Sequence, residues 1–197
     1  MKAVIFDFDG VIHDTFDFHL KKIEEYSGVK LSKQDFRDMF NGNVFKNAAE
    51  EIKDVNWLEY WKYVNSDLAA LRIKDSIRNV LLELHRRYEL FIVTSGGMKN
   101  IADYLANNNI LNVFKEVLGL EANKLKVDKF NFIFDRYALV PADCVFVTDT
   151  LGDILEANTV NLKTIAIDSG FHNRETLERG NPYRTISKME DILVNLN

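Results

Sequence analysis

Four short apolar runs rich in β-branched and aromatic residues recur along the chain, with stretches of helical periodicity between them. The runs are Ala3–Phe8, Leu90–Thr94, Val145–Thr148 and Thr164–Ile167. Runs without a polar face are typical of parallel strands that helices cover on both sides. Apolar residues at helical spacing lie between them, from Ile77 to Leu84, from Ile101 to Leu105 and from Phe130 to Tyr137. This alternation predicts an α/β fold with a doubly wound, Rossmann-like parallel sheet.

One segment, residues 15–72, breaks this alternation because it contains helical patterns and no convincing strand. The expected helices are Phe16–Tyr26, Lys33–Phe40, Val44–Ile52 and Trp57–Leu71. The segment is rich in aromatic residues, which we interpret first as helix packing faces and only second as ligand-stacking groups. We therefore expect a helical cap domain, residues 15–72, inserted into a core domain made of residues 1–14 and 73–197.

Composition limits the class of partner. The 197 residues are 47% hydrophobic, enough for one well-packed core, and the net charge of −5 argues against a broad cationic surface for nucleic acid or membrane. No apolar run has the length of a membrane-spanning helix. The single cysteine, Cys144, cannot form an internal disulfide, which fits a reduced, cytoplasmic setting. The oligomeric state is left open between a monomer and a homodimer.

Two carboxylates stand where the first run should end as a buried strand. In an extended chain, residues two apart project to the same side, so Asp7 and Asp9 should point together, and Gly10 permits a tight turn after them. Ligands of open α/β sheets bind beyond the carboxyl ends of the strands, where Mg²⁺ is held by carboxylates and a phosphate. The alternative is a turn in which both acids only cap main-chain groups.

The ends of the other runs favour the cation site. Thr94, followed by Ser95 and Gly96, offers a hydroxyl and main-chain amides that can hold phosphoryl oxygens. Asp149 ends the third run, and Asp153 follows about one helical turn later. Acid, hydroxyl and acid at three strand ends together predict a site for a cation and a phosphoryl group.

Lysines cluster before the third run, at the expected start of a helix, where they oppose the helix dipole. They are Lys124, Lys126 and Lys129. A purely structural role is therefore disfavoured, and the alternative is a solvated charged patch. The four histidines show no metal-ligand spacing, so we expect them at the surface or in supporting positions; they are His13, His19, His85 and His172.

These motifs resemble, in order and over nearly the whole chain, those of the haloacid dehalogenase superfamily of phosphohydrolases. "DFDGV" is similar to the first motif, Thr94 to the second, the lysine to the third and "TDTLGD" to the fourth. The fourth departs from the usual pattern, with Thr148 in place of glycine and Thr150 in place of serine. The helical insert resembles the cap of the phosphoglycolate phosphatase and β-phosphoglucomutase branch.

The resemblance implies a role for each site residue. Asp7 is the expected nucleophile, which forms an aspartyl-phosphate, and Asp9 the expected acid and base. Thr94 and a lysine, with Ser95 and Gly96, are expected to bind the phosphoryl oxygens of the substrate. Mg²⁺ is the expected cofactor, and its implied ligands are Asp7, the Asp9 carbonyl, Asp149 and Asp153.

The choice of lysine stays open at this point. The superfamily has a lysine-proline form, which suits the position of Lys124, and a form in which lysine opens the helix directly, which suits Lys126. No proline follows here, so Lys126 is preferred. Lys129 is expected one turn into the helix and solvated.

The leading hypothesis is a Mg²⁺-dependent phosphatase acting on a small phosphorylated metabolite. A phosphomutase of the β-phosphoglucomutase type would use the same residues but must exclude water. A signalling receiver domain is disfavoured because its lysine follows the hydroxyl at the last strand, whereas here the lysine precedes the final acidic strand. A non-catalytic protein that binds a phosphorylated ligand is the remaining alternative.

Overall fold

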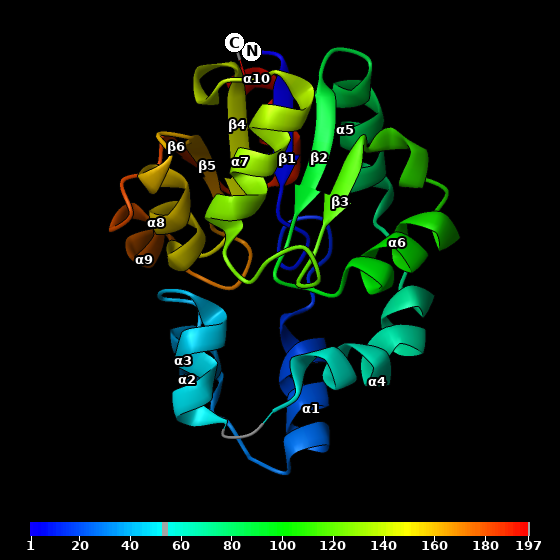
Figure 1. Cartoon of the computed structure of the whole chain (residues 1–197), viewed down its shortest axis with the longest axis vertical. Helices are drawn as coiled ribbons and strands as arrows, with labels where there is room; N and C mark the ends of the chain where they lie inside the picture. Colours follow the sequence, from blue (N-terminus) through cyan, green and yellow to red (C-terminus); the bar gives the residue numbers. More distant parts are fainter. Residues whose placement is uncertain (53–54, 197) are drawn as a thin grey trace.

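The computed structural model describes residues 1–52 and 55–196. Residues 53 and 54 of the expected cap domain and residue 197 of the expected core domain lie outside the described residues. Six parallel strands form one sheet in the order β3-β2-β1-β4-β5-β6 (Figure 1). They are β1 (Ala3–Phe6), β2 (Glu89–Val93), β3 (Glu116–Leu118), β4 (Cys144–Thr148), β5 (Lys163–Ile167) and β6 (Arg184–Ile186). The four expected strands are confirmed with shifts of one or two residues, whereas β3 and β6 at the edges were not predicted.

Helices cover both faces of the sheet, which confirms the doubly wound fold. Side chains alternate along β1: Val4 and Phe6 belong to the buried cluster that includes α5 and α6, and Ala3 and Ile5 to the cluster that includes α7. The helices that follow residue 72 are α5 (Asp75–His85), α6 (Met98–Asn107), α7 (Lys126–Tyr137), α8 (Leu151–Thr159), α9 (Arg174–Glu178) and α10 (Ile192–Asn195). Both termini lie at the opposite end of the sheet from the functional strand ends (Figure 1).

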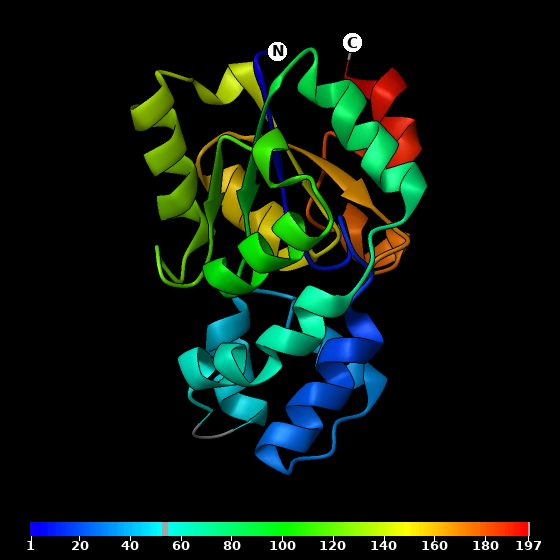
Figure 2. The same ribbon diagram turned by 90° about the vertical axis from the view of Figure 1, so that its right-hand side faces the viewer.

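Four helices between β1 and α5 gather at the carboxyl ends of the strands (Figures 1 and 2). They are α1 (Phe16–Ser27), α2 (Lys33–Asp38), α3 (Val44–Glu51) and α4 (Trp57–Ala70), and we call them the cap helices. Side chains of Ser32, Asn43 and Asn56 cap the starts of the last three, which explains where these helices begin. We propose that residues 15–72 form the cap domain.

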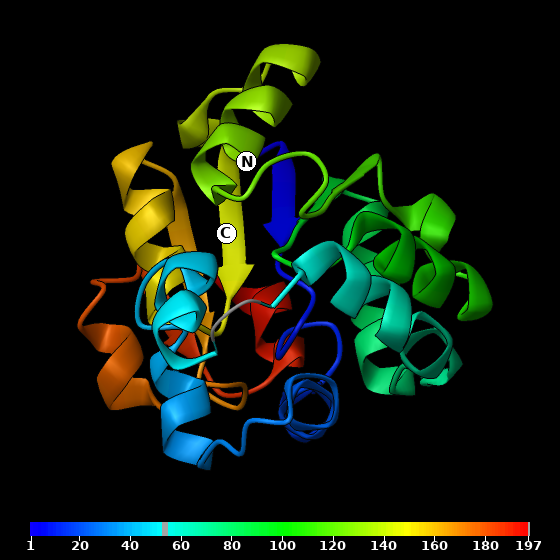
Figure 3. The same cartoon turned by 60° about the horizontal axis from the view of Figure 1, so that its bottom comes forward.

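The cap helices contact the core on two sides (Figure 3). On one side α4 packs on α6, where the Asn100 side-chain amide donates to the Trp61 carbonyl at 2.6 Å. On the other side the turn between α2 and α3 meets α8, where the Gly152 N–H donates to the Phe40 carbonyl at 2.9 Å. The strand ends between these two contacts are therefore covered. In the part of the chain that the structure describes, no helix combines the length and apolarity needed to span a membrane.

Candidate active site

The carboxyl ends of β1, β2 and β4 open into a pocket beneath the cap helices, which we call the polar chamber. In this sheet order the chain leaves β1 on one side and returns to its other side as β4, and such switch points are where open α/β sheets bind ligands. The predicted site residues that line the polar chamber are Asp7, Asp9, Thr94, Ser95, Lys126 and Asp153. Of the other two, Gly96 lines a neighbouring chamber and Asp149 is completely buried behind Gly10.

Lys126 binds two carboxylates in the polar chamber. Its Nζ lies 2.7 Å from Asp7 Oδ2 and 2.6 Å from Asp153 Oδ2. Burial raises the pKa of Asp7 well above its ordinary value although Lys126 opposes this, and the pKa of Lys126 is raised because Asp153 and Asp7 outweigh its burial. Thr148 donates to Asp153 Oδ2 at 2.6 Å, a contact that the usual glycine could not make. Lys126 is therefore held charged against Asp7.

Lys129 differs from expectation. Its side chain is 1% exposed, so the prediction that it is solvated is wrong. The Nζ donates to the Thr94 carbonyl at 2.5 Å, and burial together with the charge of Lys126 lowers its pKa to about 7. Lys124, by contrast, is exposed, and its main-chain carbonyl accepts from Asn43 Nδ2 at 3.3 Å. The buried amines of Lys126 and Lys129 therefore come from α7 itself, whereas Lys124 precedes the helix.

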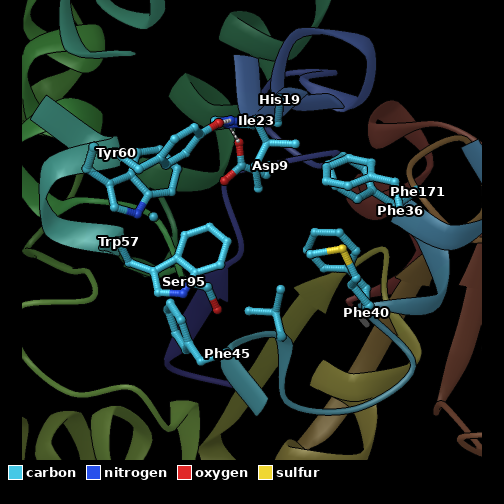
Figure 4. Close-up of a pocket in the computed structure, with 14 residues that line it drawn as sticks. Asp9, His19, Ile23, Phe36, Phe40, Phe45, Trp57, Tyr60, Ser95 and Phe171 are labelled. Carbon is cyan, nitrogen blue, oxygen red and sulfur yellow. Dashed lines mark hydrogen bonds and ion pairs between the residues drawn. The ribbon is translucent and has the colours of Figure 1, made fainter. Parts of the chain in front are cut away.

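Asp9 is linked to the cap helices through two side chains. Its Oδ1 accepts from Thr15 Oγ1 at 2.6 Å and pairs with His19 Nε2 at 3.1 Å, and His19 Nδ1 lies 2.8 Å from the Tyr60 hydroxyl (Figure 4). Burial disfavours the charged carboxylate, but His19 and Thr15 outweigh it and hold the pKa of Asp9 below its ordinary value. The expected supporting position of a histidine is thus found at His19, although no spacing signal linked it to Asp9.

Asp149 is the strongest structural argument for a cation. Its Oδ2 accepts from the Phe171 N–H at 2.7 Å, whereas its buried Oδ1 has no hydrogen-bond partner among the described residues. Burial raises its pKa to about 8. Gly10 has φ of 71°, and a Cβ there would lie 1.8 Å from Asp149 Oδ2, so this position requires glycine. This unpaired oxygen supports the prediction that Asp149 is a cation ligand.

Within residues 1–52 and 55–196, no three His, Cys, Asp or Glu side chains are arranged as a finished metal site. Lys126 accounts for this in part, because its ammonium occupies the place between Asp7 and Asp153. The ligand set of Asp7, Asp9, Asp149 and Asp153 therefore stays a prediction, which the unpaired Asp149 oxygen supports.

A second pocket, which we call the apolar chamber, adjoins the first under the cap helices (Figure 4). Asp9, Phe40, Val44, Ser95 and Phe171 line both chambers, so the two are continuous. Most of the remaining wall is aliphatic or aromatic and comes from the cap helices. The aromatic residues of the insert thus serve both packing and the chamber wall.

Comparison with known proteins identifies the family. A family model described as haloacid dehalogenase-like hydrolase matches residues 4–167. The chain belongs to the haloacid dehalogenase-like hydrolases. Among curated relatives of this hydrolase, a phosphoglycolate phosphatase of Synechococcus elongatus is 24% identical, over 98% of this chain and 96% of that protein.

Solved structures show the same fold. A haloacid dehalogenase-like hydrolase from Streptococcus pneumoniae superposes with a TM-score of 0.83 at 21% identity, covering 100% of this chain and 99% of that one. A predicted phosphoglycolate phosphatase from Haemophilus somnus gives a TM-score of 0.78 at 20% identity, covering 100% and 98%. The predicted fold and superfamily are confirmed, and the comparisons indicate that this hydrolase is a phosphatase.

Proposed function

We propose that the protein is a Mg²⁺-dependent phosphatase that hydrolyses a small phosphorylated metabolite through an aspartyl-phosphate on Asp7. The observation that carries this proposal is the contact of Lys126 Nζ with Asp7 Oδ2 at 2.7 Å in a chamber that Asp9 also lines. A nucleophile, a proton-transfer group and a fixed positive charge share one enclosed space, which is what phosphoryl transfer requires. The cytoplasm stays the proposed location, in keeping with the free, buried Cys144.

In the first half of the reaction, a carboxylate oxygen of Asp7 forms a bond to phosphorus as the bond from phosphorus to the leaving oxygen breaks. Asp9, when protonated, gives its proton to that oxygen. In the second half, a water oxygen attacks phosphorus, Asp9 takes the water proton, and the bond from Asp7 to phosphorus breaks. The low pKa that His19 and Thr15 impose on Asp9 favours the ionised state, which the second half needs.

The substrate oxygens need positive partners that do not move. Lys126 and the Thr94 hydroxyl are the proposed groups for the non-bridging oxygens, with Ser95 and Gly96 beside them. Thr94 Oγ1 is itself oriented by the Gly96 N–H at 2.9 Å. Asp7, the Asp9 carbonyl, Asp149 and Asp153 would hold Mg²⁺, which when bound offsets the repulsion between the substrate and the carboxylates.

Phosphate release from a panel of phosphate monoesters, with and without Mg²⁺, tests this proposal. We expect turnover that needs the metal and falls to background in Asp7→Asn. In Lys126→Met it should fall about 100-fold or more, because the ammonium group that faces the phosphoryl oxygens is lost. Lys124→Met is the matched control, since that side chain is exposed, and it should stay within about twofold of wild type. Turnover that survives Asp7→Asn would refute the assignment of the nucleophile.

A further inference from the structure

The two chambers divide a phosphate monoester into two parts. The proposed function places the phosphoryl group among Asp7, Thr94 and Lys126 in the polar chamber. Asp9, which must reach the leaving oxygen, lies on the wall common to both chambers. The leaving group then extends past Asp9 into the apolar chamber, so the lining of that chamber determines which alcohol the enzyme releases.

The wall of the apolar chamber is largely aromatic, and its rings surround the hollow in Figure 4. The aromatic residues that face it include Phe40, Phe45, Trp57, Tyr60 and Trp61 from the cap region and Phe171 from the core. Covering the apolar surface of a ligand with such a wall makes binding more favourable, and the aromatic side chains can stack on an aromatic ring.

The basic side chain of the lining, His19, is already engaged by Asp9 Oδ1 at 3.1 Å and by the Tyr60 hydroxyl at 2.8 Å. None of the described residues around the apolar chamber is lysine or arginine. The nearby Arg37 is engaged elsewhere, because its Nε donates to the Phe171 carbonyl at 3.0 Å and its guanidinium lies over the Phe16 ring at 4.5 Å. A second anionic group on the leaving side, such as the carboxylate of phosphoglycolate, would be buried without a cation and next to Asp9, at a high cost in free energy.

The polar groups of the chamber can serve a neutral oxygen at most. The Tyr60 hydroxyl is already in contact with His19. Trp61 Nε1 is buried and has no hydrogen-bond partner among the described residues. A sugar, which needs many hydrogen bonds, finds few partners on this wall.

We propose that the enzyme selects phosphate monoesters of an uncharged, apolar alcohol, with an aromatic ring as the preferred leaving group. This inference rests on the proposed phosphatase function, because that function places the phosphoryl group in the polar chamber. It separates the protein by substrate class from hydrolases that act on a carboxylate-bearing ester.

The decisive comparison uses phosphate esters with and without a carboxylate on the leaving group. We expect kcat/KM for phenyl phosphate to exceed that for 4-carboxyphenyl phosphate and for phosphoglycolate at least tenfold. Phe45→Lys places a cation on the chamber wall and should reverse or abolish the preference. Phe132→Lys is the matched control, because Phe132 is exposed on α7 outside the chamber, and it should leave the ratio unchanged.

A binding measurement keeps this inference separable from the proposed function. Trp57 and Trp61, the two tryptophans of the chain, both line the apolar chamber, so tryptophan fluorescence reports on its occupancy. In Asp7→Asn, which should bind without turnover, phenyl phosphate should give a saturable signal with a Kd at least tenfold lower than that of 4-carboxyphenyl phosphate.

Asp7-dependent turnover that favours phosphoglycolate or the carboxylated ester would overturn the substrate inference and leave the phosphatase function standing. An absence of turnover for every ester would refute the proposed function. In that case the fluorescence titration still decides the inference, since equal Kd values for the neutral and carboxylated esters would overturn it and the tenfold difference would support the apolar site.

Discussion

Lys126 and Lys129 lie three residues apart on α7, and both side chains are buried. Lys126 has two carboxylate partners, which keep its charge despite the loss of water. Lys129 donates to the neutral carbonyl of Thr94 and faces the charge of Lys126, so its pKa falls to about 7. A buried amine that loses its charge near neutral pH is an energetic cost that folding must offset. We attribute the presence of Lys129 to its hydrogen bond with the Thr94 carbonyl, which fixes the position of Thr94.

Replacing Lys129 should expose this cost. The pKa of Lys129 is 10.5 in an unfolded chain and about 7 in the folded protein. Between these values the unfolded state binds more protons, so the stability of wild type rises with pH from about 7 to 10, and below pH 7 the full penalty applies. The full penalty is about 5 kcal/mol, so after loss of the hydrogen bond to the Thr94 carbonyl Lys129→Met should raise the free energy of unfolding by several kcal/mol at pH 6, and by less at pH 9.

Denaturant unfolding at the two pH values measures this, and Lys124→Met, which changes an exposed side chain, should alter neither value. Activity of Lys129→Met should fall although stability rises, because Thr94 loses the donor on its carbonyl. A stability change that is the same at pH 6 and pH 9 would show that Lys129 keeps its charge in the folded protein.

Single residues were predictable from the sequence only where a strand end fixes their place. Asp7 and Thr94 follow directly after β1 and β2, so their convergence follows from a parallel sheet. The contact of His19 with Asp9 depends instead on how α1 turns back over the chamber. Lys129 lies four residues before the buried Ile133, so helical periodicity places it on the buried face of α7, and the prediction failed because a lysine was expected to be solvated.

The first turn of α8 joins the loop after β4 to the cap helices. The Gly152 N–H donates to the Phe40 carbonyl, and the Leu151 N–H donates to His172 Nδ1 at 3.0 Å. Glu156, one turn later, accepts from the Lys126 N–H at 2.6 Å and from Asn43 Nδ2 at 3.0 Å. This carboxylate also compensates the dipole at the start of α7, which the lysines there oppose.

Gly152 permits the close approach of α8 to the cap turn. A Cβ at this position would lie 2.1 Å from the Gly42 carbonyl oxygen and 2.9 Å from that of Phe40, and neither main-chain atom can move alone. Gly152→Ala should therefore displace the cap turn, cost about 1 to 3 kcal/mol in stability and lower kcat/KM about tenfold.

Thermal unfolding and steady-state kinetics test this prediction. Gly42→Ala is the matched control from the other side of the contact, because its Cβ would meet only the Asn47 side chain, at 3.3 Å, which can move aside. The idea that α8 sets the cap position fails if Gly152→Ala behaves like Gly42→Ala.

Elements were predictable in proportion to their length. The strands β1, β2, β4 and β5 each contain at least four consecutive buried residues, and each was expected within two residues. The edge strands β3 and β6 have three residues each and are only partly buried, so they leave no pattern that distinguishes them from a loop. They exist because the neighbouring strand offers a free edge.

At the scale of the whole molecule, core and cap helices enclose a space in which acidic groups outnumber their partners. Asp7 and Asp153 share Lys126, whereas one oxygen of the fully buried Asp149 stays unpaired in the described structure. The fold of the core was predictable because alternation and strand ends are local patterns. The seating of the cap helices was not, since it depends on contacts between distant residues, such as Trp61 with Asn100, 39 positions apart, and Arg37 with His172, 135 positions apart.

If a divalent cation completes this charge balance, it should stabilise the folded state by mass action. Mg²⁺ at 100 times its Kd should add about 2.7 kcal/mol, a rise in Tm of about 5 to 10 °C for a chain of this size. Asp149→Asn keeps the acceptor for the Phe171 N–H but removes the charge, so its Tm should not respond to Mg²⁺. Asp135→Asn, which changes an exposed residue of α7, should respond as wild type does. Thermal unfolding with chelator and with increasing Mg²⁺ measures these shifts, and an equal rise in Asp149→Asn would place the cation elsewhere in the molecule.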